Sequence, residues 1–241
     1  MAIFSDIPQS IIGVWGNSFK LYKKAFSKVL PLSVLIGLIT NFPAMMLFYR
    51  AYKNQFAAYQ ALPSNSFFIV SVVLLLVIWW FMAVLFLRIS DVLEDHVLSC
   101  LHEITVATYK YIVYMVAMLF FIILVSSGFI ALVIPGIFFL ILFRYVWLNI
   151  LLDDGTVYSS FKNSAKLVWG NWWRTFVVIF VPTIILVGVF QLVTFFLGGF
   201  VQPIVIGGKI VLAIIFWSII MPFMFSLDLC QYRDLKIRAK S

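Results

Sequence analysis

Residues 111–152 read YIVYMVAMLFFIILVSSGFIALVIPGIFFLILFRYVWLNILL, and this stretch decides the fold. Its first part, 111–134, carries no charge and is long enough to cross the ~30 Å hydrocarbon layer, which takes about 20 apolar residues in a helix. The Pro-Gly pair at 135–136 predicts a tight turn. The second part, 137–152, is shorter, contains Arg144 and is followed by two aspartates. The stretch therefore predicts two antiparallel membrane-spanning helices.

Four more uncharged apolar runs of similar length lie on either side of this hairpin. The whole chain is 64% apolar and only 11% charged, which leaves too few charges to cover the exterior of a soluble domain of 241 residues. The sequence predicts an all-α membrane protein with six transmembrane helices, forming one polytopic domain over residues 1–241. The predicted spans are 29–49, 67–87, 111–134, 137–152, 176–200 and 210–227.

The net charge of +8 is best explained by membrane topology. Positive charge resists translocation, and the connections on one side hold most of the 17 Lys and Arg residues. The opposite side has only Arg50, Lys53 and Lys209. Both termini are therefore predicted to be cytoplasmic. No long basic cluster with interleaved aromatic residues is present, so nucleic-acid binding is not expected.

A threefold repeat of an amphipathic helix followed by a transmembrane hairpin is one interpretation of the pattern. Apolar residues at spacings of four and seven precede spans one, three and five, with a basic residue at the start of each span. Such helices would lie on the cytoplasmic surface and face lipid phosphates. The alternative is that any juxtamembrane segment has this composition. The candidate lipid-interface residues are Lys24, Lys110, Trp172, Trp173 and Arg174.

Signatures of enzymes are missing from the sequence. His102-Glu103 does not continue into the zinc-binding H-E-x-x-H pattern, and the two cysteines lack metal-ligand spacing. Neither a G-x-S-x-G elbow nor a Walker-type phosphate loop is present. We therefore expect no catalytic residues, no cofactor and no metal.

Arg144 is the most informative polar residue because it lies inside a predicted span. It is about 12 Å of helix from the cytoplasmic boundary, and leaving it unpaired there would cost on the order of 3 kcal/mol. One interpretation is structural: Arg144 reaches the interface, or pairs with helix-end carbonyls or an acid such as Asp228. The other is functional: Arg144, Gln191 and Asn41 form an intramembrane polar site for an anionic substrate or lipid phosphate. Interhelical hydrogen bonding is the simpler interpretation of Gln191 and Asn41.

Two acidic groups each have two interpretations. The first group is Asp91, Glu94, Asp95 and Glu103. It is either a docking surface or cation site, or a solvated helix face with its acids near the positive end of the helix dipole. The second group, Asp153-Asp154-Gly155, either binds a cation, or ends span four and caps the next helix.

The hairpin and the segment after it, roughly residues 130–180, resemble a known family. Ile134-Pro135-Gly136-Ile137 opens a span that carries Arg144, and a helix ending in Gly170-Asn171-Trp172-Trp173-Arg174 follows. This pattern is similar to the YciC-like uncharacterised bacterial inner-membrane proteins and to the membrane domain fused to some glycerophosphodiester phosphodiesterases. Lys166 lies farther from Gly170 than in the family's usual Lys-Gly pair. The resemblance implies a six-span inner-membrane protein connected with envelope maintenance; the soluble phosphodiesterase domain is absent.

Three functions fit these features. The first is a non-enzymatic protein of the bacterial inner membrane that interacts with membrane lipids or serves envelope maintenance. The second is a small transporter or channel for an anionic solute or lipid, built around Arg144. The third is an accessory subunit that binds other membrane proteins in a larger complex.

Overall fold

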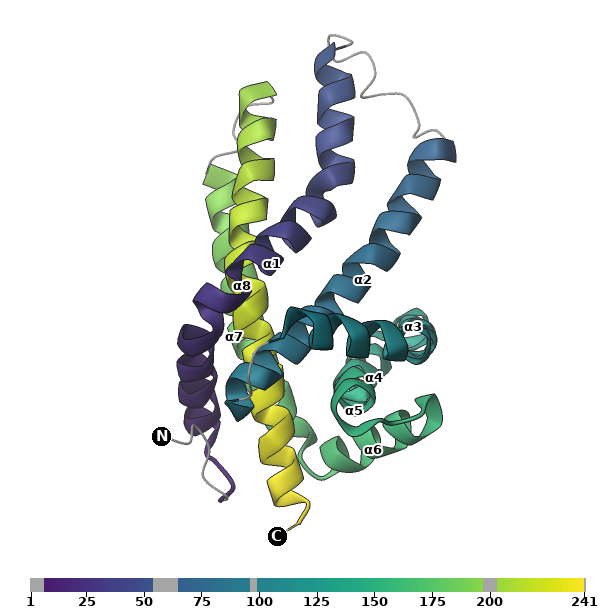
Figure 1. Cartoon of the computed structure of the whole chain (residues 1–241), viewed down its shortest axis with the longest axis vertical. Coiled ribbons are helices and arrows are strands. Elements are labelled where there is room, and N and C mark those ends of the chain that lie inside the picture. Colours follow the sequence, from purple (N-terminus) through teal and green to yellow (C-terminus); the bar gives the residue numbers. More distant parts are fainter. Residues whose placement is uncertain (1–6, 54–64, 96–98, 197–202, 241) are drawn as a thin grey trace.

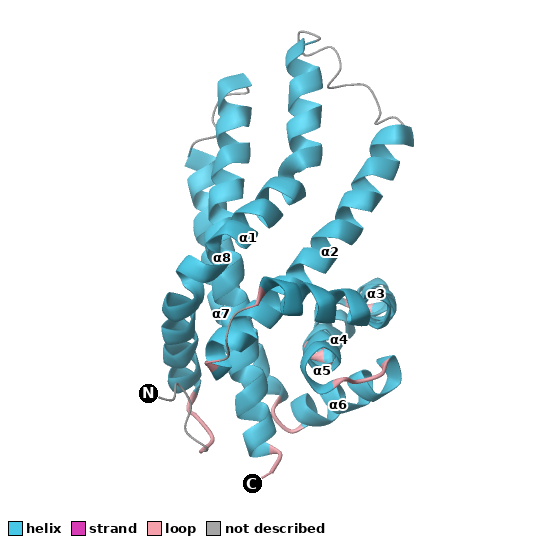
Figure 2. Cartoon of the chain, viewed as in Figure 1, coloured by secondary structure: helices cyan, strands magenta, loops and turns pink. Residues whose placement is uncertain are grey.

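The computed structural model describes residues 7–53, 65–95, 99–196 and 203–240. Within these ranges every regular element is a helix and no strand is found (Figure 2). The helices are α1 (Ile11–Lys53), α2 (Asn65–Glu94), α3 (Cys100–Ala131), α4 (Val133–Leu142), α5 (Val146–Asp153), α6 (Val157–Trp169), α7 (Trp172–Phe196) and α8 (Pro203–Arg238).

Six helical stretches in this described part are long and apolar enough to cross a membrane, which confirms the predicted fold class. Their large apolar side chains are widely exposed, for example Ile130 at 87%, Phe196 at 81% and Ile184 at 62%. A surface of this kind is compatible with lipid as its solvent. The six stretches are Ile11–Tyr49, Phe67–Glu94, Cys100–Ala131, Val133–Asp153, Trp172–Phe196 and Gly207–Arg238.

The helices form an elongated group with a cluster at one end (Figure 1). α1 and α8 pack against each other, α2 packs on α1, and α3 to α6 gather beside the lower half of α8. The buried core lies where α1, α2, α5 and α8 meet, around Leu21, Ile36, Leu85, Leu148 and Leu227. The first and last residues that the structure describes lie at the same end of the molecule (Figure 1).

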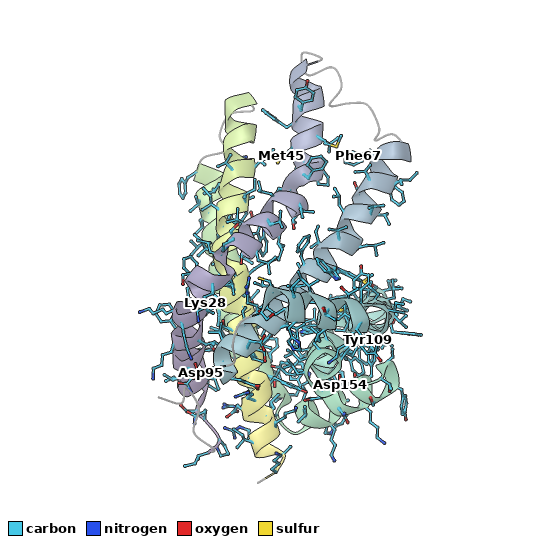
Figure 3. The ribbon with its side chains drawn as sticks, in the orientation of Figure 1. Lys28, Met45, Phe67, Asp95, Tyr109 and Asp154 are labelled. Atoms are coloured by element: carbon cyan, nitrogen blue, oxygen red, sulfur yellow. The ribbon has the colours of Figure 1, made fainter. Side chains whose placement is uncertain are left out.

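Polar and apolar side chains separate along the long axis. Nitrogen- and oxygen-bearing side chains gather toward the end that holds Asp95 and Asp154, whereas the end near Met45 and Phe67 is mostly carbon (Figure 3). α1 has 43 residues, about 64 Å of helix, and is therefore longer than a bilayer is thick. The polar end of the molecule is thus placed to lie at or beyond one membrane surface.

The turn between α3 and α4 is three residues earlier than predicted. Leu132 is extended (φ −167°, ψ 156°), whereas the Pro-Gly pair at 135–136 lies in the first turn of α4. Proline fits there because first-turn N–H groups have no partner within the helix. A Cβ on Gly136 would meet the Phe129 ring at 2.5 Å, and one on Gly128 would lie 2.9 Å from the Gly136 Cα. The pair therefore serves close packing of the hairpin.

The fourth span, Val133–Asp153, contains a turn, and one cap prediction is wrong. Residues 143–145, which include Arg144, form this turn between α4 and α5 with i→i−3 hydrogen bonds. The aspartates do end the span, since α5 stops at Asp153 and Asp154 is left-handed (φ 53°). They do not cap the next helix: Thr156 is the N-cap of α6 and accepts from the Ser159 N–H.

The three predicted amphipathic segments differ in the structure. Only the third is a separate helix, α6; the other two are continuous with α1 and α3. α6 runs antiparallel beside α4 and α5, since Ser164 Oγ donates to the Leu142 carbonyl at 2.9 Å and the Phe138 and Trp169 rings are 5.8 Å apart. In the topology expected from the sequence, the α3–α4 turn and the start of α7 lie on opposite sides of the membrane. In the structure α4 lies alongside α6, so the α3–α4 turn lies close to the start of α7.

Candidate functional site

Arg144 forms a buried ion pair with Asp228 of α8. The turn between α4 and α5 presents the guanidinium, whose Nε and Nη2 donate to the two Asp228 carboxylate oxygens at 3.1 and 2.8 Å. Asp228 is 1% exposed, and the Arg144 guanidinium also lies 5.1 Å from the Trp147 ring centroid. Two parallel hydrogen bonds to one carboxylate are a strong and directional arrangement. Of the interpretations of Arg144, the structure shows the pairing with Asp228.

A second buried acid, Asp234, links α7, α8 and the residues before α1. Arg174 and Arg238 both donate to Asp234 Oδ2, at 2.9 and 2.8 Å, and Asp234 Oδ1 accepts from the Gln9 N–H at 2.6 Å. Both guanidinium groups also donate to the Gln9 carbonyl. Sequence reasoning missed this network because it treated residues after 227 as a polar tail. The apolar positions Leu229 and Leu235 were the available sign that the helix continues.

The structure does not bring Arg144, Gln191 and Asn41 into one site. Asn41 Nδ2 donates to the Gly37 carbonyl of its own helix at 2.8 Å. The backbone carbonyl of Gln191 accepts from Thr194 Oγ1 at 3.0 Å, also within one helix. These hydrogen bonds are local rather than interhelical. The three residues therefore make separate contacts on α1, α7 and the α4–α5 turn.

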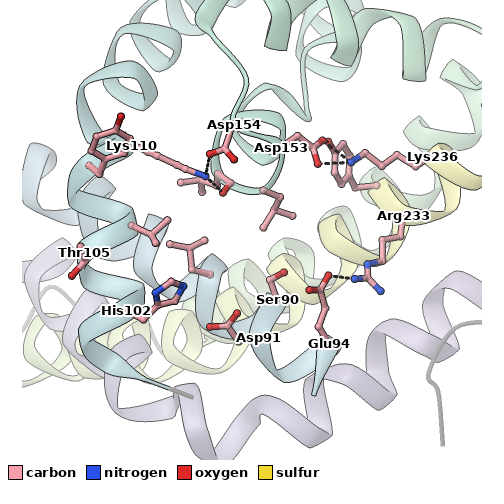
Figure 4. Close-up of a pocket in the computed structure, with 16 residues that line it drawn as sticks. Ser90, Asp91, Glu94, His102, Thr105, Lys110, Asp153, Asp154, Arg233 and Lys236 are labelled. Atoms are coloured by element: carbon pink, nitrogen blue, oxygen red, sulfur yellow. Dashed lines mark hydrogen bonds and ion pairs between the residues drawn. The ribbon is translucent and has the colours of Figure 1, made fainter. Parts of the chain in front are cut away.

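A polar cleft of about 660 Å³ lies at the charged end, between the end of α2, the start of α3, the end of α5 and α8 (Figure 4). Lys110 Nζ bonds the Asp154 carboxylate at 2.6 Å and the Leu151 carbonyl at 2.7 Å. Lys236 bonds Asp153 at 2.5 Å. Arg233 pairs with Glu94, which also lines the cleft. Basic and acidic groups thus neutralise each other within the cleft.

Three members of the first acidic group, Glu94, Asp95 and Glu103, form intramolecular ion pairs. Lys24 donates to Asp95, and this hydrogen bond and the lysine charge hold the pKa of the Asp95 carboxyl below its ordinary value. Glu103 is 1% exposed and has Oε2 3.4 Å from Arg88 Nε. Because Glu103 is buried, it is neither part of a docking surface nor part of a solvated helix face. A cluster of three or more His, Cys, Asp or Glu able to hold a metal is not found among the residues the structure describes.

An apolar cavity of about 630 Å³ lies between α4, the end of α6 and the start of α7. Trp172 is its central side chain: its ring stacks on Phe138 and Phe176 at 5.9 and 5.5 Å, and its Nε1 donates to the Phe138 carbonyl at 3.4 Å. Trp169 and Trp173 are 69% and 73% exposed. We name this cavity the aromatic groove; it is lined by Ile134, Ile137, Phe138, Trp169, Trp172, Trp173 and Phe176.

The predicted lipid-interface residues divide into two kinds. Lys24, Lys110 and Arg174 are bound to acids of the same chain, which a single sequence does not reveal. Trp172 and Trp173 both line the aromatic groove. Beside this groove, α6 exposes two other basic residues, Lys162 and Lys166, and neither has an ion-pair partner in the described part of the chain.

The apolar surface and the six long helices define an all-helical integral membrane protein. No protein-family model, no curated protein and no solved structure matches the chain.

Proposed function

We propose that this chain is a non-enzymatic protein of the bacterial inner membrane that binds membrane lipids and serves envelope maintenance, with both termini in the cytoplasm. The observation that carries the proposal is the contrast between two sites. Arg144 and Arg174 are engaged in intramolecular ion pairs, whereas the aromatic groove is apolar and open, and two unpaired lysines of α6 lie beside it in the part of the chain that the structure describes. Membership of the YciC-like family is part of the same proposal and rests on the motif at residues 134–174.

A transporter or channel for anions is less well supported by the geometry. An anion pathway through Arg144 needs guanidinium donors that are free to meet the anion, but Nε and Nη2 are directed at Asp228. Gln191 and Asn41 bond within their own helices. The polar cleft is lined by carboxylates as well as lysines, which does not favour a multivalent anion.

Thermal unfolding in nanodiscs tests lipid binding directly. A lipid that binds only the folded protein raises its stability by RT ln(1 + [L]/Kd), about 2.7 kcal/mol at a hundredfold excess over Kd. We expect a higher Tm in nanodiscs containing anionic phosphatidylglycerol than in nanodiscs of zwitterionic phosphatidylcholine of the same chain length. An equal Tm in both would remove the main support for the proposal.

A further inference from the structure

Lys162 and Lys166 lie on the exposed side of α6, next to the wall of the aromatic groove. Lys166 precedes Trp169 by three residues, and side chains at this spacing are neighbours on a helix surface. Lys162 lies one turn earlier on the same face. Trp169 belongs to the groove lining. Two free ammonium groups therefore stand at one edge of an apolar cavity.

The groove has the residue composition that is typical of a membrane interface. Tryptophan rings are enriched at the headgroup boundary, where an apolar face and a polar edge are both accommodated, and Trp169, Trp172 and Trp173 meet here. α6 is amphipathic: Val168 and Ser164 are buried, while its lysines are exposed. A helix of this kind lies in the interface plane with its basic residues toward lipid phosphates. Acyl chains would approach the groove from the membrane side and phosphates from the α6 side.

We infer that the aromatic groove and the α6 lysines form a site for one anionic phospholipid, whose acyl chain occupies the groove and whose phosphate contacts Lys162 and Lys166. The inference rests on the proposed function and specifies where the lipid binds. The volume of about 630 Å³ is within the ~300–1,000 Å³ range of ligand pockets. Charge complementarity favours an anionic headgroup, because no acid among the described residues forms an ion pair with either lysine. The same two charges disfavour a second copy of this face as the occupant, because like charges would meet.

Native mass spectrometry of the delipidated full chain in neutral detergent measures the binding of single lipids. We expect the wild type to retain one phosphatidylglycerol in preference to phosphatidylcholine of equal chain length. The double substitution K162Q/K166Q should weaken phosphatidylglycerol binding about thirtyfold, since each lysine near an anionic lipid surface contributes roughly one factor of five to six. Both side chains are exposed, so folding should be unaffected.

The matched control is K20Q/K28Q, which removes the same charge from exposed positions on α1, a helix that does not line the groove. We expect this variant to bind the retained lipid as the wild type does. If K162Q/K166Q and K20Q/K28Q weaken binding equally, or neither does while the wild type still prefers phosphatidylglycerol, the site is wrong although lipid binding stands. If the wild type shows no preference, the proposed function itself fails.

Two further arms separate the lipid from other occupants. Inorganic phosphate at millimolar concentration should not displace the lipid, because it offers nothing to the groove; displacement would overturn the assignment of the acyl chain. Phosphatidylglycerol with bromine on its acyl chain should quench tryptophan fluorescence of the wild type more than that of W169F/W173F. Equal quenching in both proteins would place the acyl chain elsewhere.

Discussion

Replacing Asp228 with asparagine should destabilise the protein more than any charge substitution at its surface. Asp228 is 1% exposed and accepts two hydrogen bonds from Arg144, so D228N leaves a guanidinium without its counter-ion at the centre of α4, α5 and α8. Breaking a buried pair in this way typically costs about 3–5 kcal/mol. For a chain of this size such a loss lowers Tm on the order of 10 °C.

A double variant that removes both charges separates the cost of an unpaired charge from the contribution of the pair. We expect R144M/D228L to be more stable than D228N, because it removes both buried charges together and substitutes apolar side chains of similar bulk. Thermal unfolding of the purified variants in one lipid composition is the measurement. The exposed pair between Lys24 and Asp95 is the control, and K24Q/D95N should change stability by no more than about 1 kcal/mol. A D228N cost as small as the control's, or a double variant less stable than D228N, would refute the reasoning.

Three more substitutions test the fold. G136A should cost about 1–3 kcal/mol in thermal unfolding because the new Cβ collides with an aromatic ring of α3, whereas G170A meets nothing within 4 Å and should cost nothing; equal effects would contradict the close hairpin. In a variant without the native cysteines, L132C and a cysteine on the exposed face of α6 should react with an impermeant maleimide from the same side of the membrane, since α4 runs beside α6; labelling from opposite sides would contradict this packing. R174Q should raise amide hydrogen exchange around Gln9, whose carbonyl loses a donor at 2.7 Å, and unchanged exchange would show that Arg238 alone holds this segment.

The six membrane-spanning stretches of the described chain followed from the sequence because a membrane helix is recognised by length and composition alone. Residues 111–134 needed no partner to be identified, and α3 covers most of them. The ends of elements were less predictable. The Pro-Gly pair looks like a turn in sequence, yet the turn is at Leu132, because the close approach of Gly136 to Phe129 fixes where the two helices separate. The side chain at the break, Arg144, pairs with Asp228, 84 residues away, a contact that local sequence does not show.

Sequence patterns singled out two tryptophans of the candidate site but not the acids that pair with the candidate basic residues. Trp172 and Trp173 were expected at an interface on residue type, and both line the aromatic groove. Lys110 and Arg174 have the same local pattern as a lysine that faces lipid phosphates, but Asp154 and Asp234 bind them. Local spacing cannot show an acid 44 or 60 residues away along the chain, so the pattern did not indicate that these basic residues pair within the chain.

The distribution of the net charge gives the lipid proposal its direction. In the described part of the chain, seven acids form ion pairs with eight basic residues. Most of the excess positive charge of this part therefore comes from basic residues outside these pairs, and the lysines among them that lie on helices at the polar end are Lys20, Lys23 and Lys28 on α1 and Lys162 and Lys166 on α6. If the basic excess served only to orient the chain during insertion, any placement along the polar end would suffice. The lysines outside the ion pairs lie instead on the exposed faces of two helices, where they can contact an anionic membrane surface. On α6 these lysines also lie beside an apolar groove.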